Sequence, residues 1–107
     1  MTEDCRDKVV VITGGSAGVG RATAVEFARR GANLALIARG RERLQSACEE
    51  VERAGGRAIA LEADVADADQ VEAAAGRAEG ELGPIDIWIN NAMASVISPA
   101  KETTAAE

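Results

Sequence analysis

Residues 14 to 20, GGSAGVG, offer a ligand little besides main-chain amides. They follow the β-branched run Lys8–Thr13 and precede a segment of helical periodicity. Gly14 lets the chain turn off a strand, Gly18 leaves room for a pyrophosphate beside the backbone, and Gly20 lets a helix pack close to a sheet. The amides at the start of a helix carry partial positive charge toward phosphate oxygens. The stretch therefore predicts binding of a dinucleotide pyrophosphate.

Side chains add little to this turn, although the Ser16 hydroxyl can donate a hydrogen bond. The spacing G-x-x-x-G-x-G differs from the common G-x-G-x-x-G, and a glycine-rich turn can be purely structural. The strand before it and the helix after it favour the ligand-binding interpretation. The predicted cofactor contacts in this turn are Gly14, Gly15, Ser16, Ala17, Gly18, Val19 and Gly20.

The elements that must position this turn follow from hydrophobic periodicity. Short apolar runs alternate with longer amphipathic ones, so strands are expected at 8–13, 33–38, 57–62 and 85–90 and helices at 19–30, 41–54 and 67–82. The pattern β-α-β-α-β-α-β implies right-handed crossovers and a parallel sheet. The expected fold is α/β: a Rossmann-type doubly wound parallel sheet, incomplete, with strand order 3-2-1-4.

Several helix details can also be predicted. The first helix should bury the stripe Ala22, Val25 and Ala28, with Gly31 as its stop. The third helix should begin after Asp67 as N-cap, with Gln70 in the capping-box position. These patterns orient the helices on the sheet.

Composition limits the classes of function. The chain has 107 residues, enough for a single domain, and a formal net charge of −6 with no long basic run, which argues against a nucleic-acid partner. There is no histidine, and Cys5 and Cys48 lack CxxC spacing, so no metal site is expected. No apolar run approaches a membrane span of about 20 residues, and the N-terminus lacks a signal-peptide pattern. A cytoplasmic protein is expected.

The cysteines and the tryptophan are interpreted as structural. Cys48 lies on the inward stripe of the second helix, and Cys5 is expected on a mobile terminus without a role. Two free thiols are favoured over a disulfide. Trp88 is expected to pack within a sheet covered on both faces.

With Thr13 in front, the turn TGGSAGVG resembles the T-G-x-x-x-G-x-G motif of the short-chain dehydrogenase/reductase family. Further stretches agree with that family in order and position: Ala38-Arg39, Asp64-Val65 and Asn90 to Ala92 (NNA). The resemblance covers Lys8 to Ala92. It implies an oxidoreductase that binds NAD or NADP and moves a hydride between nicotinamide and a small-molecule carbonyl or alcohol.

Arg39 bears on the choice of cofactor. Folds that prefer NAD usually carry an acidic residue at the end of the second strand, where this chain has Ala38. Alanine removes the repulsion of a 2′-phosphate, and the Arg39 guanidinium can bind that phosphate, so NADP is predicted. The alternative is that Arg39 starts a solvated basic patch with Arg41 and Arg43.

The remaining site residues are implied by the resemblance. Asp64 would accept a hydrogen bond from the adenine amino group and Val65 would cover the ring; alternatively, Asp64 is a helix-capping aspartate. Asn91 and Ala92 would line the ribose and stabilise the sheet. The family usually has a glycine where this chain has Met93, which puts the geometry of that loop in doubt.

Catalytic residues are not predicted in this chain. The family uses a serine and a Tyr-x-x-x-Lys pair well downstream of the NNA segment, whereas this chain has no tyrosine. Ser95 and Ser98 follow the fourth strand too closely to be the family's serine. The chain is expected to be an NAD(P)-binding domain over 1–107, the N-terminal portion of a longer, truncated enzyme, with 93–107 starting a loop and helix.

Two alternatives to that enzyme remain open: a non-catalytic dinucleotide-binding module and a remnant without function. Strand order 3-2-1-4 would leave the apolar fourth strand, IDIWIN, at an edge. Such an edge lacks the lysines or prolines that discourage pairing. Self-association is therefore predicted.

Overall fold

In the computed structural model, which describes residues 5–91, four parallel strands form a sheet of order β3-β2-β1-β4. The elements are β1 (Val9–Thr13), α1 (Gly18–Arg29), β2 (Asn33–Ala38), α2 (Arg41–Arg53), β3 (Arg57–Glu62), α3 (Ala68–Leu82) and β4 (Ile87–Asn90). The predicted fold class, element order and strand order are confirmed. The expected loop and helix start at 93–107 lie outside the described residues.

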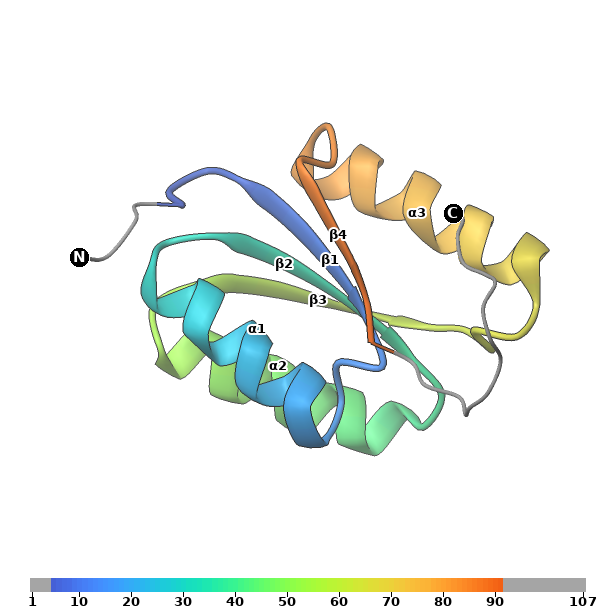
Figure 1. Ribbon diagram of the computed structural model, residues 1–107, viewed down its shortest axis with the longest axis horizontal. Helices are drawn as coiled ribbons and strands as arrows, with labels where there is room; N and C mark the ends of the chain where they lie inside the picture. The colour runs from blue at the N-terminus through green and yellow to red at the C-terminus, as the bar shows by residue number, and fades with distance from the viewer. Residues whose placement is uncertain (1–4, 92–107) are drawn as a thin grey trace.

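Helices cover both faces of the sheet. Figure 1 shows α1 and α2 on one face and α3 on the other. Alternate residues of β1 therefore enter different cores: Val10 and Ile12 pack with α1 and α2, and Val11 packs with α3. Every residue of β1 is buried, as expected of a β-branched strand covered on both faces.

The start of β4 is fixed by an aspartate. Asp86 donates its backbone N–H to the Val9 carbonyl at 2.9 Å, and its carboxylate Oδ2 accepts from the Val9 N–H at 2.9 Å. The strand consequently begins at Ile87, two residues later than the apolar pattern predicts.

The predicted inward stripe of α1 is wrong in part. Ala22 is exposed, whereas Ala24 and Ala28 are buried and face the core one helical turn apart. The helix is rich in alanine on several sides, so side-chain hydropathy alone does not fix its rotation. The close approach at Gly20, described below, fixes it instead.

The cap of α3 is confirmed. The Asp67 carboxylate accepts from the amides of Asp69 at 3.0 Å and Gln70 at 3.3 Å. The Gln70 side chain does not return to the Asp67 amide as in a full capping box. Its Oε1 accepts from the Asp64 N–H at 2.8 Å, and its Nε2 donates to Asp67 Oδ2 at 3.1 Å. Gln70 thus joins the end of β3 to the start of α3.

Both cysteines are free thiols and both are buried. The expectation for Cys5 was wrong: it joins the core on the α1 and α2 face, and its N–H donates to the Arg30 carbonyl at 2.9 Å. That backbone bond holds the segment before β1 against the end of α1.

Burial, and then the nearby carboxylates of Glu52 and Glu49, raise the pKa of the Cys48 thiol from 9.0 to about 11. In the Cys5→Ser variant, we expect thiolate absorbance at 240 nm to titrate near pH 11 in the native protein and near pH 9 in urea. The unfolded chain loses its proton first. The contribution of Cys48 to the free energy of unfolding is therefore fully present below pH 9 and is lost as the pH rises toward 11. A native midpoint near 9 would contradict the burial.

β4 is an edge strand, and its side chains are only partly covered. Ile87 and Ile89 pack at the margin of one core, whereas Trp88 remains 38 % exposed on the opposite face. Trp88 is therefore not enclosed as expected, because α3 packs over β1, β2 and β3 rather than over this strand. Within residues 5–91, no helix combines the length and the apolar character needed to cross a membrane.

Candidate functional site

The segments predicted to bind a ligand leave the sheet at the same edge. Thr13, the last residue of β1, is in register with Ile37 of β2 and with Asn90 of β4. Ala38, the last residue of β2, is in register with Glu62 of β3. In an open parallel sheet this carboxyl edge is where ligands bind.

The exposed residues of the glycine-rich turn lie at the carboxyl edge of the sheet. Gly14 has a φ of +72°, and its N–H donates to the Ile37 carbonyl at 2.7 Å, which sets the exit from β1. Ala17, Gly18 and Val19 are exposed, and Val19 reaches 73 %. Gly15, Ser16 and Gly20 are buried beneath them. The accessible part of the predicted contact set is thus the first turn of α1.

Gly18 and the helix start it occupies are open to solvent. Gly18 has a φ of +59°, and apart from its neighbours along the chain no described atom lies within 4 Å of where its Cβ would be. Among the described residues, no side chain caps α1, since its N-cap residue is Ala17. The first amides of this helix are therefore left to solvent or to a ligand.

Gly20 is required by a close approach. A Cβ at this position would lie 2.3 Å from the Gly14 carbonyl oxygen and 2.5 Å from Asn91 Nδ2. Asn91 Nδ2 itself donates to the Gly14 carbonyl at 3.4 Å. Asn91, the residue after β4, thus stabilises the glycine-rich turn, and a ribose contact is also predicted for it. Ala92, the other residue predicted here, lies outside the described residues.

The buried Thr13 hydroxyl joins the ends of β1 and β4. It donates to Asn90 Oδ1 at 2.8 Å and accepts from the Asn91 N–H at 3.1 Å. The Asn91 N–H also reaches the Thr13 carbonyl at 3.2 Å. These bonds hold Asn91 beside the glycine-rich turn.

Thr13→Val, which exchanges the hydroxyl for a methyl group, should lower the free energy of unfolding by about 1 kcal/mol. The Asn91 N–H keeps its backbone acceptor, whereas the Asn90 side-chain oxygen and, at 3.5 Å, the Ile89 carbonyl lose the hydroxyl as a donor. Urea unfolding followed by circular dichroism measures this. Thr13→Ser retains the hydroxyl and serves as the control; if it proves as costly as Thr13→Val, packing of the methyl group rather than hydrogen bonding is responsible.

Arg21 is a site-supporting residue that the sequence analysis missed. Its Nε donates to Glu50 Oε1 at 2.6 Å, its Nη2 to Ser46 Oγ at 3.0 Å, and its Nη1 to the Ser16 carbonyl at 3.5 Å. The guanidinium therefore ties the glycine-rich turn to α2. The i, i+4 spacing of Ser46 and Glu50 was a signal for a shared helix face, but their partner on α1 was not readable from it.

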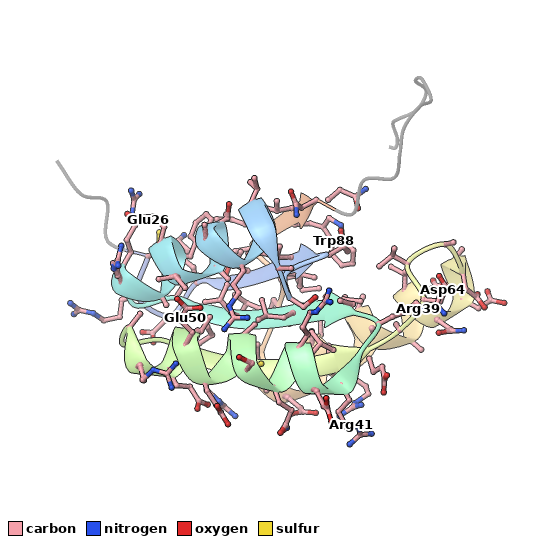
Figure 2. All side chains as sticks on the ribbon, turned by 90° about the horizontal axis from the view of Figure 1, so that it is seen from below. Glu26, Arg39, Arg41, Glu50, Asp64 and Trp88 are labelled. Atoms are coloured by element: carbon pink, nitrogen blue, oxygen red, sulfur yellow. The ribbon has the colours of Figure 1, made fainter. Side chains whose placement is uncertain are left out.

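Arg39 and Asp64 meet at the same edge, beyond β2 and β3. Their Nη1 and Oδ2 atoms are 3.9 Å apart, with side chains 76 % and 40 % exposed, and Figure 2 shows them side by side. Asp64 Oδ1 also accepts from the Ala66 N–H at 2.9 Å, in a local turn. Asp67, not Asp64, is the N-cap of α3. Asp64 Oδ2 thus lies beside Arg39, and Val65, the next residue, is 38 % exposed.

A cavity of about 570 Å³ lies at the start of α2, lined by Arg39, Gly40, Arg41, Glu42 and Arg43. Ala38, the residue before Arg39, is buried and carries no charge. Gly40 is the N-cap of α2, with a φ of +91°, and no described side chain caps this helix either. The cavity thus combines three guanidinium groups and one carboxylate, Glu42, with helix-terminal amides that no described side chain caps, and the excess of positive charge suits a phosphate group.

The residues present fit a phosphorylated dinucleotide. The open amides at Gly18 are placed for a pyrophosphate, the arginine-lined cavity is suited to a further phosphate, and Asp64 offers an acceptor for an amino group. The backbone at Gly18 carries no side chain that would block an approaching phosphate. A ligand spanning these groups would lie along the carboxyl edge of the sheet.

Comparison with known proteins agrees with this geometry. The family described as short chain dehydrogenase matches residues 8–107. A short chain dehydrogenase of Pseudocercospora fijiensis is 40 % identical over 92 residues, covering 86 % of this chain and 30 % of that protein. A 3beta-hydroxysteroid dehydrogenase of Eggerthella lenta is 39 % identical over 101 residues, covering 94 % of this chain and 39 % of that protein.

Solved structures give the same result. A short chain dehydrogenase of Mycobacterium thermoresistibile superposes with a TM-score of 0.83 at 36 % identity, over 96 % of this chain and 39 % of that one. The L-sorbose reductase of Gluconobacter frateurii, solved with NADPH and L-sorbose, has a TM-score of 0.83 at 34 % identity, over 99 % and 41 %. The chain thus spans 30–41 % of the length of these relatives. With the family matched over nearly all of its residues, the chain belongs to the short-chain dehydrogenase family of oxidoreductases.

Proposed function

We propose that this chain is a dinucleotide-binding unit that prefers NADP and serves an oxidoreductase acting on a small-molecule carbonyl or alcohol. The observation that carries the proposal is the pairing of an open helix start at Gly18 with a guanidinium-lined cavity beyond the uncharged Ala38. The neighbouring L-sorbose reductase structure, which holds NADPH, supports the choice of cofactor. The two free cysteines support a cytoplasmic location.

Each group has a defined role in holding the cofactor. The amides of Gly18 and Val19 would bind the pyrophosphate, and the exposed Val19 side chain would shield it from water. Arg39 would bind the 2′-phosphate, and Asp64 would accept from the adenine amino group. When bound, the cofactor supplies or accepts the hydride. Asn91 would keep the glycine-rich turn in its binding conformation through the Gly14 carbonyl.

The proton transfer that accompanies hydride transfer needs an acid or base near neutral pKa. The sequence holds no histidine and no tyrosine. That observation favours a second candidate function for these residues on their own: a binding module that does not catalyse. The two candidates share the cofactor site and differ in whether NADPH is consumed in the presence of a carbonyl substrate.

Calorimetric titration of the chain with NADPH and with NADH tests the proposal. We expect NADPH to bind more tightly than NADH, with one site per chain. No heat of binding from either dinucleotide at millimolar concentration would overturn the proposed function. Equal affinities would leave a dinucleotide site but overturn the preference for NADP.

Self-association through β4 is part of the same proposal. Within residues 5–91 no strand pairs with the outer side of β4, which also carries the partly exposed Trp88 side chain. We expect sedimentation velocity to show species larger than a monomer. Trp88→Lys should shift them toward the monomer, because the lysines introduced on the β4 strands of two chains would repel each other at the interface. Ala22→Lys, at an exposed position of α1, is the control. A wild-type chain that is monomeric at high concentration would contradict this.

A further inference from the structure

The side chain of Arg21 leaves α1 near its start and contacts acceptors from two different segments. Its Nε donates to Glu50 Oε1 at 2.6 Å, and its Nη2 donates to Ser46 Oγ at 3.0 Å. Both acceptors are on α2, and Figure 2 shows Glu50 between the two helices. The Nη1 of Arg21 reaches the Ser16 carbonyl at 3.5 Å. One guanidinium therefore connects α2 with the turn proposed to bind the pyrophosphate.

The ion pair of Arg21 with Glu50 differs from an ordinary surface pair. The Arg21 side chain is 27 % exposed, whereas that of Arg29, which pairs with Glu26 at 3.5 Å within α1, is 65 % exposed. Water screens the Arg29 pair and leaves its side chain free to change rotamer. The shorter, largely covered contact holds the Arg21 guanidinium in one place. Arg21 is thus a fixed group and not a solvated surface charge.

The helix α2 anchors that guanidinium firmly. Four side chains of this helix are buried in the core: Leu44, Ala47, Cys48 and Val51. Ser46 and Glu50 are spaced i, i+4, so they lie on one side of the helix and offer both acceptors to α1. The core packing of α2 therefore sets the position of Arg21, and the exposed turn does not.

The contact at Ser16 acts on the peptide that leads into α1. The Ser16 carbonyl and the Ala17 N–H belong to one peptide unit, directly before Gly18, where the helix starts. A carbonyl oxygen carries partial negative charge, so a rotation of this peptide that turned the oxygen toward the ligand would repel a phosphate. A donor bound to the carbonyl opposes that rotation, and Arg21 supplies one. The amides at the helix start then meet the phosphate without a competing oxygen.

We propose that Arg21 is a positioning residue for dinucleotide binding. Held in place by α2, it fixes the Ser16–Ala17 peptide, so that the start of α1 presents N–H donors and not a carbonyl to the pyrophosphate. This inference rests on the proposed function and adds α2 as the support of the pyrophosphate site. Because Arg21 acts through this peptide and not on the 2′-phosphate, its loss should weaken NADPH and NADH equally.

The test is fluorescence titration of the full chain with NADPH and with NADH. We expect Arg21→Gln to weaken both about ten-fold, which leaves the ratio of the two affinities unchanged. ADP-ribose, which carries the pyrophosphate without the nicotinamide, should lose the same factor when it competes with NADPH. Arg29→Gln is the matched control, because it removes the same charge from an exposed position of the same helix, and it should change no affinity.

Glu50→Gln separates positioning from charge. Removing this carboxylate raises the local positive charge, so a purely electrostatic effect would strengthen the binding of an anionic dinucleotide. Positioning predicts the opposite, because a neutral amide holds the Arg21 guanidinium less firmly than a carboxylate does. We expect both dinucleotides to bind about three-fold more weakly. Glu50 is 42 % exposed, so this variant should fold and provides a second measurement in case Arg21→Gln does not fold.

The outcomes separate this inference from the proposed function. If the wild-type chain binds neither dinucleotide, both are overturned. If it binds them, but Arg21→Gln lowers stability in urea without lowering the affinity of the folded chain, only the positioning role is overturned. The same conclusion follows if Glu50→Gln strengthens binding, or if the NADPH to NADH ratio changes in Arg21→Gln, since a changed ratio would indicate a displaced α2.

Discussion

Replacing Gly20 with alanine should lower the free energy of unfolding by about 3 kcal/mol, at the upper end for an overpacked site. The added Cβ would lie 2.3 Å from the Gly14 carbonyl oxygen and 2.5 Å from Asn91 Nδ2. The side-chain amide of Asn91 can move aside, but the Gly14 carbonyl is part of the backbone, and the Gly14 N–H bond to the Ile37 carbonyl anchors this residue at the exit of β1. Relief therefore requires α1 to move away from the sheet.

That movement should also impair the ligand site, because the first amides of α1 and the Gly14 turn would separate. Urea unfolding followed by circular dichroism and by fluorescence of the single tryptophan, Trp88, measures the stability change. NADPH titration at low temperature, where the variant remains folded, measures the loss of affinity. We expect both to fall.

Gly76→Ala is the matched control. Gly76 lies within α3 and is exposed, and apart from its own helix backbone and chain neighbours no described atom lies within 4 Å of its Cβ position. Alanine there should raise the free energy of unfolding by about 0.5–1 kcal/mol, since a helical glycine costs conformational entropy. If Gly20→Ala were as well tolerated as Gly76→Ala, the close packing of α1 on the glycine-rich turn would be wrong.

The strands and their order could be predicted because the relevant signals are local. β2 and β3 have the predicted bounds, since their apolar runs end at polar or glycine residues on both sides. Right-handed crossovers then leave few ways to order parallel strands. The glycine spacing similarly identified the exposed helix start at Gly18, because glycine at a strand-to-helix turn has a specific steric purpose.

The features that could not be predicted depend on contacts between distant segments. Cys5 becomes buried because its backbone N–H pairs with the Arg30 carbonyl, which no local pattern near Cys5 reveals. The Arg21–Glu50 pair depends on how α1 and α2 lie against each other. The rotation of α1 depends on the contact at Gly20, since alanines on different faces have the same hydropathy.

The sequence predicted roles for some charged residues near the proposed ligand but not which of them lie close together. Arg39 and Asp64 were each given a role from position, but their proximity follows from the pairing of β2 with β3. Arg41 and Glu62 appeared only as a possible basic patch and a strand end. The ends of β2 and β3 lie side by side in the sheet, and this brings Arg39 close to Asp64 and Arg41 close to Glu62.

Arg39→Asp should weaken NADPH binding about 100-fold, which corresponds to about 2.7 kcal/mol. The substitution removes a charge-assisted hydrogen bond to the 2′-phosphate, worth about 1.5–3 kcal/mol, and adds repulsion from a carboxylate. NADH lacks that phosphate, and its ribose hydroxyl can donate to the introduced carboxylate, so its affinity should hold or rise. The preference should therefore move from NADPH to NADH. Calorimetric titration with each dinucleotide measures the ratio.

Two further variants make the result specific to the site. Arg39→Gln removes the charge without adding one and should weaken NADPH about ten-fold while leaving NADH unchanged. Lys8→Asp makes the same change of charge at the other end of β1, before Val9, and should leave the ratio near its wild-type value. Arg39 is 76 % exposed, so its substitution should not unfold the chain, and a change in affinity reports on the ligand contact. An unchanged NADPH to NADH ratio in Arg39→Asp would mean that this guanidinium does not touch the 2′-phosphate.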